Sequence, residues 1–373
     1  MSNSFVLSNL AARPARTIAS LLGIALGVVL VMVTVGLARG ILSDTGQREK
    51  NVGAEILFQS PGSLGASVTA TPLVVPLAYC ERLRQIEGVQ AVTPVGRYIR
   101  SGATGIGFEL IEGIADRAQD GYVSYAEISG IRIVEGQPMT SDNDVLVDRR
   151  YALNRKVGPG SRIELFNHTF RVAGIYEPES GARVKMRLSK MQELLAAPGK
   201  CSSILIKCKN PEEQEIVASR IDAALPGNQI VFTRDIPSYY EKGMPSLNVF
   251  LRVVIGLALV VSSLVILLAM YTSITERTRE IGILKSLGAS RRFIVLTIEK
   301  EAITISLLGI VTGYIASYLT KMGITTYTTL IVKFELKWCL AAAGIGLLAG
   351  ALGALYPALY AANQDPVKAL AYE

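Results

Sequence analysis

The sequence predicts an α-helical membrane protein with four transmembrane helices plus a large extracytoplasmic α/β domain carrying a β-rich insertion. Half of the residues are hydrophobic and 18% are charged, a composition too apolar for an ordinary soluble protein and too charged for a wholly membrane-embedded one. Four uncharged apolar stretches are each long enough, at about 1.5 Å per residue, to cross a hydrocarbon core of about 30 Å. These stretches are Thr17–Leu37, Val253–Thr275, Ala302–Thr320 and Trp338–Ala362.

Positive charge sets the predicted orientation, because Lys and Arg are enriched in cytoplasmic loops. Arg13 and Arg16 precede the first stretch, and the connection between the second and third holds Arg277, Arg279, Lys285, Arg291, Arg292 and Lys300. Both termini and this connection are therefore predicted to be cytoplasmic, at the inner membrane. The connection around Lys321 to Lys337 then lies outside, although its three lysines run against the charge rule.

The first stretch has an alternative interpretation as a signal peptide. Its apolar core is longer than the usual 7 to 15 residues, roughly, and no clear cleavage site follows, so a retained membrane anchor is favoured. The residues before it, which include Phe5, Val6, Leu7 and Leu10, fit a short amphipathic helix lying on the inner membrane surface or a frayed start.

Alternating and β-branched residues predict mixed α and β structure in the outer segment. Helical spacing is expected at Leu77–Ile86 and at Glu212–Leu225, which Pro211 opens. Strands are expected at Ala54–Gln59, Val89–Pro94, Phe108–Ile114, Val145–Val147, Arg162–Phe166, Thr169–Ile175, Ser203–Lys207 and Gln229–Phe232.

These patterns divide the chain into consecutive segments. We expect an N-terminal amphipathic segment (1–16), the first transmembrane helix and stalk (17–40) and the extracytoplasmic domain (41–245, β-rich at about 105–185). The second transmembrane helix (246–275), a cytoplasmic segment (276–300) and the third transmembrane helix (301–320) follow. A short outer loop (321–337), the fourth transmembrane helix (338–362) and a cytoplasmic tail (363–373) complete the order.

Several functions are disfavoured by what the sequence lacks. It has no GxxxxGK[ST] phosphate loop, no HExxH or GxSxG motif and no CxxC pair, so neither a catalytic nor a metal-binding residue is assigned. No basic run is interleaved with aromatic residues, which argues against nucleic acid as a partner. No Asp, Glu, Lys, Arg or His lies within the four stretches, whereas proton- and sodium-coupled carriers commonly need such a residue there.

The cysteines and the single histidine carry no clear function. If the outer segment faces an oxidising compartment, two of Cys80, Cys201 and Cys208 could form a disulfide, but three unpaired thiols are an equally good interpretation. A lone histidine such as His168 is more often a surface or strand residue than a ligand or base.

The segment Glu276–Ser290 has the pattern of a short amphipathic helix closed by a turn. Ile281, Leu284 and Leu287 recur at three-residue spacing and predict one apolar stripe, while Arg277 and Glu280 are spaced as an i,i+3 ion pair. Gly288 suits the left-handed backbone conformation that often ends an α-helix, and Ser290 suits the N-terminal cap of the next helix. The helix could rest in the membrane interface or fill a groove in another protein.

This segment and both ends of the chain resemble the FtsX/MacB-type (type VII) ABC transporter permease family. The N-terminal resemblance rests on Asn9-Leu10, Arg13, Arg16-Thr17 and Leu22 to Val28. The C-terminal resemblance rests on Tyr356-Pro357-Ala358, Ala361-Ala362, Asp365-Pro366-Val367, Ala369-Leu370 and Tyr372-Glu373, although Tyr360 and Ala371 stand where the family often has a basic residue. One span, a large outer domain and three more spans is also the order of the family.

The resemblance implies a non-catalytic permease that docks a pair of separate ATPase subunits, which bind ATP and Mg, and that holds no cofactor itself. It implies a second permease protomer, identical or different, contact with membrane lipids and, as a further candidate partner, a periplasmic membrane-fusion protein. The coupling helix that meets the ATPase would include Glu276, Arg277, Glu280, Ile281, Gly282, Leu284, Lys285, Leu287, Gly288, Ala289 and Ser290.

Small residues at four-residue spacing predict close packing of transmembrane helices. Gly23 with Gly27 and Gly346 with Gly350 are the two pairs, and they suit packing within the chain or between protomers equally well. Pro357 is expected to kink or end the fourth helix.

Three functions follow as hypotheses. The first is the permease subunit of a complex that exports or extrudes a lipid, lipoprotein, peptide or drug. The second is a mechanotransmitter whose outer domain activates a cell-envelope enzyme. The third is a membrane receptor or anchor that works without ATP. The length of the outer segment favours the first.

Overall fold

The computed structural model describes residues 14–61, 73–101, 108–117, 121–238 and 245–365. The chain divides into two compact units. The helical unit comprises residues up to Gly40, Pro245–Thr326 and Leu330 onward, and the outer unit comprises Ile41–Met244 with Tyr327–Thr329. The amphipathic segment expected before the first membrane helix, and the C-terminal motif from Pro366 onward, fall outside the described residues except at 14–16.

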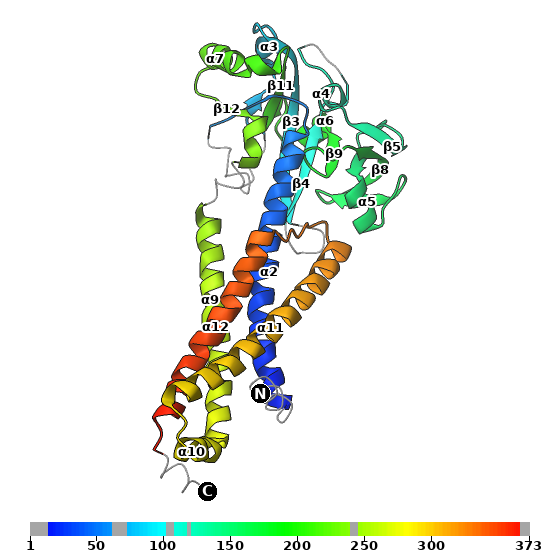
Figure 1. Cartoon of the computed structure of the whole chain (residues 1–373). Helices are drawn as coiled ribbons and strands as arrows, with labels where there is room; N and C mark the ends of the chain where they lie inside the picture. Colours follow the sequence, from blue (N-terminus) through cyan, green and yellow to red (C-terminus); the bar gives the residue numbers. More distant parts are fainter. Residues whose placement is uncertain (1–13, 62–72, 102–107, 118–120, 239–244, 366–373) are drawn as a thin grey trace. The chain divides into compact units, whose positions relative to one another are not determined.

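Four long helices make up most of the helical unit (Figure 1). They are α2 (Pro14–Lys50), α9 (Pro245–Glu276), α11 (Arg291–Tyr327) and α12 (Leu336–Asn363), and all four are long and apolar enough to cross a membrane. The prediction of four membrane helices is confirmed. Each helix extends beyond its apolar stretch, because hydropathy detects only the residues that suit lipid. The last turns of α2, from Ile41 to Lys50, belong to the outer unit.

Helix α12 packs closely against α9. A Cβ added at Gly353 would lie 2.5 Å from the backbone oxygen of Ser263, so only a residue without a side chain fits there. Helix α2 meets α11 in the same manner, because Cβ atoms at Gly309 and Gly313 would meet the side chains of Ile24 and Val28. Close backbone approach at small residues is the usual way in which membrane helices associate.

Pro357 does not end α12, so the expectation that the fourth helix stops at this proline is wrong. The helix continues past Pro357 to Asn363, and the Pro357 side chain is buried. Proline is tolerated inside membrane helices because neighbouring helices and their side chains can satisfy the backbone groups that it leaves unpaired.

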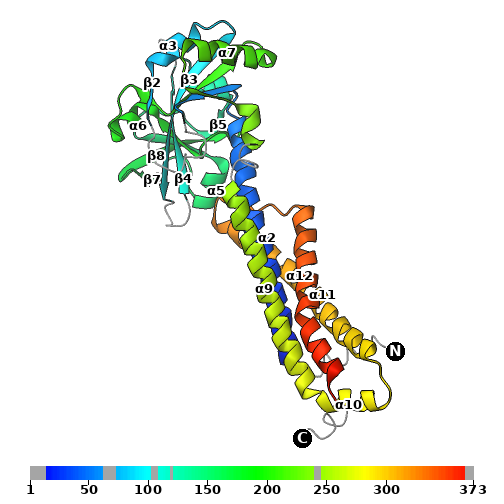
Figure 2. The same ribbon diagram turned by 90° about the vertical axis from the view of Figure 1, so that its left-hand side faces the viewer.

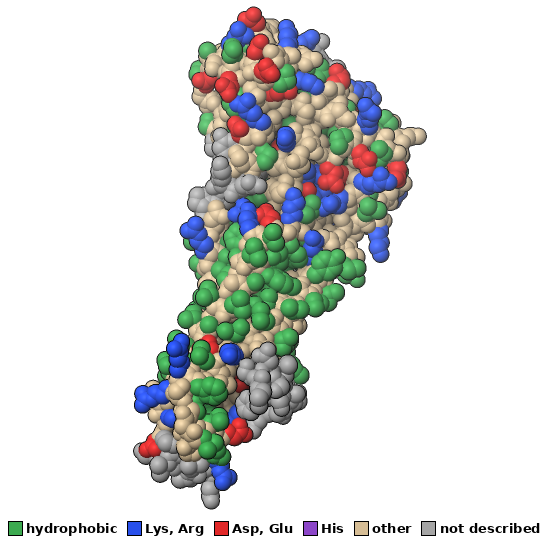
Figure 3. All heavy atoms as spheres, viewed as in Figure 1, with side chains coloured by type: hydrophobic (Ala, Val, Ile, Leu, Met, Phe, Trp, Pro, Cys, Tyr) green, Lys and Arg blue, Asp and Glu red, His purple; other side chains and the backbone are tan. Residues whose placement is uncertain are grey.

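Apolar side chains that face away from the bundle form the surface expected to meet lipid. Leu26, Leu257, Leu264 and Leu268 are all more than half exposed. Figure 3 shows a field of hydrophobic side chains over these helices. Such a surface would be unfavourable in water and is appropriate in a bilayer.

The outer unit is built on a 10-stranded sheet of mixed direction, with the order β12-β1-β11-β3-β4-β9-β6-β8-β5 and with β7 paired to β8. The strands are β1 (Ile56–Gln59), β3 (Val89–Ser101), β4 (Phe108–Ile114), β5 (Arg132–Gly136), β6 (Asp144–Asp148), β7 (Arg162–Leu165), β8 (His168–Glu177), β9 (Val184–Arg187), β11 (Ser203–Cys208) and β12 (Gln229–Phe232). A small second sheet joins β2 (Val75–Pro76) to β10 (Lys200–Cys201).

The β-rich segment predicted at about 105–185 supplies strands β4 to β8 and the start of β9. Its strands do not form a separate sheet, because β4 pairs in parallel with β9 and antiparallel with β3. One sheet therefore runs through both parts of the outer unit.

Helices cover both faces of the central strands. These helices are α3 (Ala78–Arg84), α4 (Tyr125–Ser129), α5 (Arg149–Arg155), α6 (Leu188–Leu194) and α7 (Gln214–Ala224), with short 3-10 turns at Pro211–Glu213 and Thr233–Asp235. Ile56 and Phe58 pack with Leu83 of α3 and Ile221 of α7, whereas the intervening Leu57 packs with α4. A strand covered on both faces needs apolar residues at successive positions, which explains the run Ile56–Phe58.

A fully buried ion pair lies at the junction of β4 and β9. Lys185 of β9 donates a hydrogen bond to its register neighbour Glu112 of β4, and both side chains are inaccessible to solvent. Burial alone would raise the pKa of Glu112, but the nearby ammonium of Lys185 and guanidinium of Arg97 lower it below its ordinary value.

The C-terminal end of α2 is held in the outer unit by a second buried charge. The Arg48 guanidinium donates to Asp148 at 2.6 Å, to the Gly181 carbonyl at 2.7 Å and to Glu179 at 3.0 Å. Glu49, the next residue, accepts a hydrogen bond from Arg97 at 2.6 Å. Because an unpaired buried charge is strongly unfavourable, these contacts fix the end of the helix on the sheet.

Candidate functional site

The segment after α9 forms the helix α10 (Thr278–Ser286), which lies where α9 ends and α11 begins (Figure 2). The short helix expected within Glu276–Ser290 is therefore present. Arg277 is its first flanking residue, and Glu280 lies in its first turn, where a carboxylate suits the helix dipole.

The turn that closes α10 has the geometry predicted from its glycine and serine. Gly288 has a φ of 92°, its N–H donates to the Lys285 carbonyl, and the Ala289 N–H donates to the Leu284 carbonyl, both at 3.0 Å. This pair of bonds is a Schellman motif. The Ser290 hydroxyl oxygen then accepts from the Phe293 N–H at 3.2 Å and caps α11.

The start of α10 is tied to α11 by an ion pair that was not predicted. Arg277 lies 3.6 Å from the carboxylate of Glu301, whose side chain is buried. The predicted pair of Arg277 with Glu280 does not form: Arg277 pairs with Glu301 instead, and the Glu280 side chain is exposed. Glu301 lies just before the apolar stretch of α11, so sequence reasoning gave it no role.

The other end of α10 is tied to α12. The Lys285 ammonium donates to the carbonyl oxygen of Ala362 at 2.9 Å and also to that of Gln364. Unpaired carbonyl groups at a helix C-terminus carry partial negative charge, so a cation there is favourable. Sequence spacing could not reveal this contact, because its acceptors are backbone atoms far along the chain.

The two sides of α10 differ in exposure. Thr278, Ile281 and Gly282 face the bundle and are buried or partly buried. The predicted stripe of Ile281, Leu284 and Leu287 is therefore divided, since Ile281 packs inward while Leu284 and Leu287 are exposed.

The exposed side carries four residues at positions i, i+3, i+4 and i+7, which place them on one helix face. We call them the α10 patch: Glu280, Ile283, Leu284 and Leu287. Leu287 is 80% exposed, more than any of the other apolar members. Sequence reasoning missed Ile283, although its spacing from Leu287 contained the signal. This arrangement suits insertion of a helix into the groove of another protein.

The predicted packing glycines all lie against neighbouring helices of the same chain. Cβ atoms at Gly23 and Gly27 would clash with Val265 and Ser262 of α9, and those at Gly346 and Gly350 would clash with Ile310 and Ser306 of α11. The Ser262 hydroxyl also donates to the Gly23 carbonyl at 3.3 Å. Gly309, Gly313 and Gly353 have equally close neighbours and were not predicted.

The other candidates from the sequence form no reactive centre. Cys80, Cys201 and Cys208 are buried free thiols, and Cys339 is a partly buried one. Burial raises the pKa of the Cys80 thiol to about 12 and that of Cys208 to about 11. His168 is exposed, and its Nδ1 lies 2.8 Å from the Phe166 carbonyl. Within the described residues, His, Cys, Asp and Glu side chains form no group that could hold a metal ion.

Two family models match the chain. Residues 17–224 match the MacB-like periplasmic core domain, and residues 252–366 match the FtsX-like permease C-terminal domain. The first match covers more than half of the 373 residues.

Curated relatives agree with these matches. The chain is 24% identical over 395 residues to the macrolide export ATP-binding/permease protein MacB of Campylobacter jejuni strain 81-176, and the alignment covers 98% of this chain but 60% of that protein. It is 23% identical to a macrolide export ATP-binding/permease protein MacB of Escherichia coli, and the alignment covers 96% of this chain and 58% of that protein. It is 25% identical to the uncharacterized ABC transporter permease YknZ of Bacillus subtilis, with 98% of both chains covered. The chain thus spans about three fifths of the length of the MacB relatives.

Solved structures of outer domains are also similar. The periplasmic region of MacB from Actinobacillus actinomycetemcomitans aligns with 51% of this chain and 93% of its own, at 15% identity and a TM-score of 0.36. The extracellular domain of the YknZ transporter from Gram-positive bacteria aligns with 48% of this chain and 99% of its own, at 10% identity and a TM-score of 0.35.

Four membrane helices, a large extracytoplasmic α/β unit and a helix–turn connection between the second and third membrane helices define an ABC transporter permease. The chain belongs to the FtsX-like permeases that carry a MacB-like periplasmic core domain. The resemblance identified from the sequence motifs is confirmed.

Proposed function

We propose that this chain is the permease subunit of an export complex, in which a separate ATPase moves α10 and the membrane helices pass that movement to the outer unit. The α10 patch carries the proposal, because three exposed apolar side chains on one short helix favour burial against a partner.

The contacts of α10 support its role as a lever. Arg277 joins it to α11 and Lys285 joins it to α12, so a force on the patch would act on both helices. The basic residues around α10 support a cytoplasmic position for it and for both termini, which is where ATP is available.

An ATPase as the working partner of the permease is supported by relatives that are named ATP-binding/permease proteins. The sequence has no phosphate loop for nucleotide binding. The relatives called ATP-binding/permease proteins extend well beyond the aligned part, whereas YknZ, called a permease, aligns over nearly its whole length. In the proposed complex, ATP and Mg bind to the ATPase, and the permease described here is non-catalytic.

Export is the favoured work of the complex, because several relatives are named for macrolide export. We infer a lipid, lipoprotein, peptide or drug as cargo. A second permease protomer and a periplasmic membrane-fusion protein complete the proposed assembly at the inner membrane.

Purification from native membranes tests the proposal. The full chain, carrying an affinity tag, is extracted in a mild detergent and assayed for vanadate-sensitive hydrolysis of Mg-ATP. The proposal predicts hydrolysis by a co-purified subunit that carries a phosphate loop. A preparation that holds the intact chain and hydrolyses no ATP would contradict it and would favour an ATP-independent receptor or anchor.

A further inference from the structure

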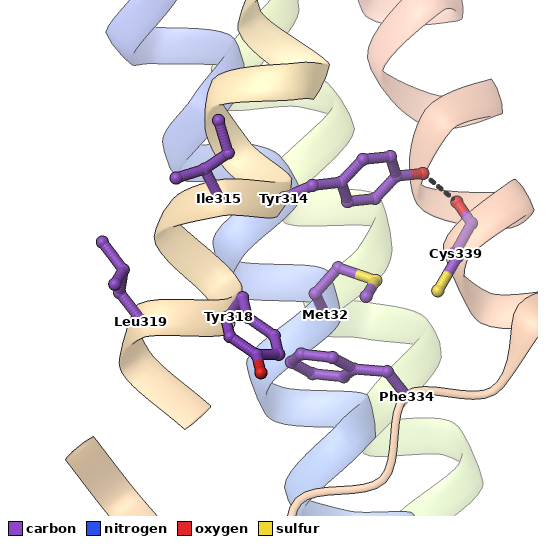
Figure 4. A pocket seen from close by; sticks show the side chains of 7 residues that line it. All are labelled: Met32, Tyr314, Ile315, Tyr318, Leu319, Phe334 and Cys339. Carbon is purple, nitrogen blue, oxygen red and sulfur yellow. Dashed lines mark hydrogen bonds between the residues drawn. The ribbon is translucent and has the colours of Figure 1, made fainter. Parts of the chain in front are cut away.

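An apolar pocket of about 420 Å³ lies within the helical unit (Figure 4). Met32 of α2, Tyr314 and Tyr318 of α11, Cys339 of α12 and Phe334 from the α11–α12 connection contribute to its lining. The Tyr314 hydroxyl already donates to the Cys339 carbonyl, so the pocket presents hydrocarbon and aromatic surface to an occupant. Its volume lies in the range of about 300–1,000 Å³ that is typical of ligand sites.

The connection between α11 and α12 is folded onto α2 and forms one wall. The Lys333 N–H donates to the Gly36 carbonyl at 2.9 Å, and a Cβ at Gly36 would lie 2.9 Å from the Phe334 ring. A Cβ at Gly40 would overlap the Ile331 carbonyl oxygen. Gly36 and Gly40 therefore allow the connection to lie close against the backbone of α2, and this contact holds Phe334 at the edge of the pocket.

Two cations lie beside this wall, each over an aromatic ring. The Lys321 ammonium is 5.1 Å from the centre of the Phe334 ring, and the Arg39 guanidinium is 5.8 Å from that of Trp338. Neither makes an ion pair with a carboxylate of the described residues, whereas the neighbouring Lys337 is paired with Glu335 at 2.7 Å. Positive charge at this end opposes the usual bias of membrane proteins toward basic cytoplasmic loops.

We propose that the pocket binds one acyl chain of an anionic phospholipid, whose headgroup is held by Lys321 and Arg39. An apolar recess in contact with lipid, bordered by unneutralised cations, matches the two chemically different parts of such a molecule. Basic pockets between membrane helices bind anionic headgroups on the cytoplasmic side of membranes, and we propose the same pairing of charges at this outer end. A zwitterionic lipid would fill the recess equally well but would gain less from the cations.

The chain carries its own reporter of this site. Trp338 is the only tryptophan in the sequence, and it lies next to the pocket residue Cys339. Lipids brominated on their acyl chains quench tryptophan on contact. The full chain is therefore reconstituted in nanodiscs containing brominated phosphatidylglycerol or brominated phosphatidylcholine, each diluted in the unlabelled zwitterionic lipid, and Trp338 fluorescence is measured.

Each basic residue near a membrane surface contributes about fivefold, so with Lys321 and Arg39 together the anionic lipid is expected to reach its quenching midpoint at a mole fraction about 25-fold lower than the zwitterionic lipid. Lys321→Gln should reduce this preference to about fivefold, the share of Arg39, which remains. Lys337→Gln, which removes an exposed and already paired lysine at the same end, should keep it.

Equal midpoints for the two lipids in the wild-type chain would overturn the proposal, whether or not the variants fold. An equal loss of the preference for the anionic lipid in Lys321→Gln and in Lys337→Gln would also overturn the proposal, because the preference would then come from general surface charge. Neither result bears on the proposed ATPase, since the experiment uses the permease chain alone.

Discussion

The Lys285 side chain of α10 donates a hydrogen bond of 2.9 Å to the carbonyl oxygen of Ala362 in the last turn of α12. At the other end of α10, Arg277 lies 3.6 Å from Glu301 of α11. The helix that carries the α10 patch is thus attached to two membrane helices by charged contacts as well as by the chain itself. Through these contacts, we expect a displacement of α10 to move α11 and α12 as well.

Replacement of Lys285 by Met should loosen α10 without changing the fold of the bundle, because the apolar stem is kept and only the ammonium is lost. Amide hydrogen exchange of residues 278–289, measured on the full chain in detergent, is expected to accelerate severalfold. Arg279→Met is the matched control, since Arg279 is exposed on the same helix and makes no ion pair with a described residue. Equal exchange in the two variants would show that Lys285 does not hold α10 in place.

Gly353→Ala should destabilise the helical unit, because the new methyl group would lie 2.5 Å from the backbone oxygen of Ser263. Overpacking of this type costs about 1–3 kcal/mol. Gly344→Ala on the same helix should change little, since nothing lies within 4 Å of its Cβ position. Thermal unfolding of the two variants in detergent compares them directly, and a lower midpoint for Gly344→Ala than for Gly353→Ala would refute the packing of α12 on α9.

Glu112→Gln should destabilise the outer unit by about 3–5 kcal/mol, because Lys185 would be left as a buried charge without its counter-ion. The double variant Glu112→Leu with Lys185→Met removes both charges and should recover most of that loss. Glu193→Gln is the control, since this exposed carboxylate pairs with Lys190 at the surface, where an ion pair contributes about 0–1 kcal/mol. Chemical denaturation of the full chain is the measurement, and a double variant less stable than Glu112→Gln would contradict the account.

Asp144 gives a prediction about pH. Hydrogen bonds from Arg171 are the main cause that lowers the pKa of Asp144, and the Ser141 and Thr140 N–H groups add to it. Because the folded-state pKa lies below the unfolded value of about 3.9, its stabilisation is present above that pH and is lost as the pH falls further.

Asp144→Asn should therefore lower the thermal midpoint at pH 7, consistent with about 1–3 kcal/mol for a buried charged hydrogen-bond partner. The difference in thermal midpoint between Asp144→Asn and the wild-type chain should become smaller below about pH 4. Asp142→Asn, at a side chain that is 61% exposed, should have a small effect throughout. A gap for Asp144→Asn that is constant from pH 7 to pH 3 would exclude the carboxylate as its cause.

The sequence predicts the regular parts of the fold well where a local pattern determines them. The strand Gln229–Phe232 has the bounds expected for it, and helix α7 lies within its predicted range because Pro211 and Gly227 mark its ends. Helices α4, α5 and α6 were missed, since segments of five to seven residues are too short to establish helical periodicity.

The candidate site shows the same limit. Gly288 and Ser290 act on their immediate neighbours, so their roles could be predicted. The partners of Arg277 and Lys285 come from α11 and α12, and only tertiary packing determines them. The division of the apolar stripe also depends on packing, because the bundle covers the side of α10 that contains Thr278 and Gly282.

The most direct test of a permease driven through α10 is a charge placed on the α10 patch. Leu287→Glu is compared with Ile216→Glu, which places the same charge on an exposed apolar residue of α7 in the outer unit. Tagged chains are purified from native membranes, and vanadate-sensitive Mg-ATP hydrolysis is measured per mole of permease. Leu287→Glu is expected to lower the co-purified activity at least about tenfold, because a charge without a partner would be buried in the interface and weaken binding of the ATPase. Ile216→Glu is expected to keep the activity. Full activity in Leu287→Glu, at wild-type levels of folded chain, would contradict the account.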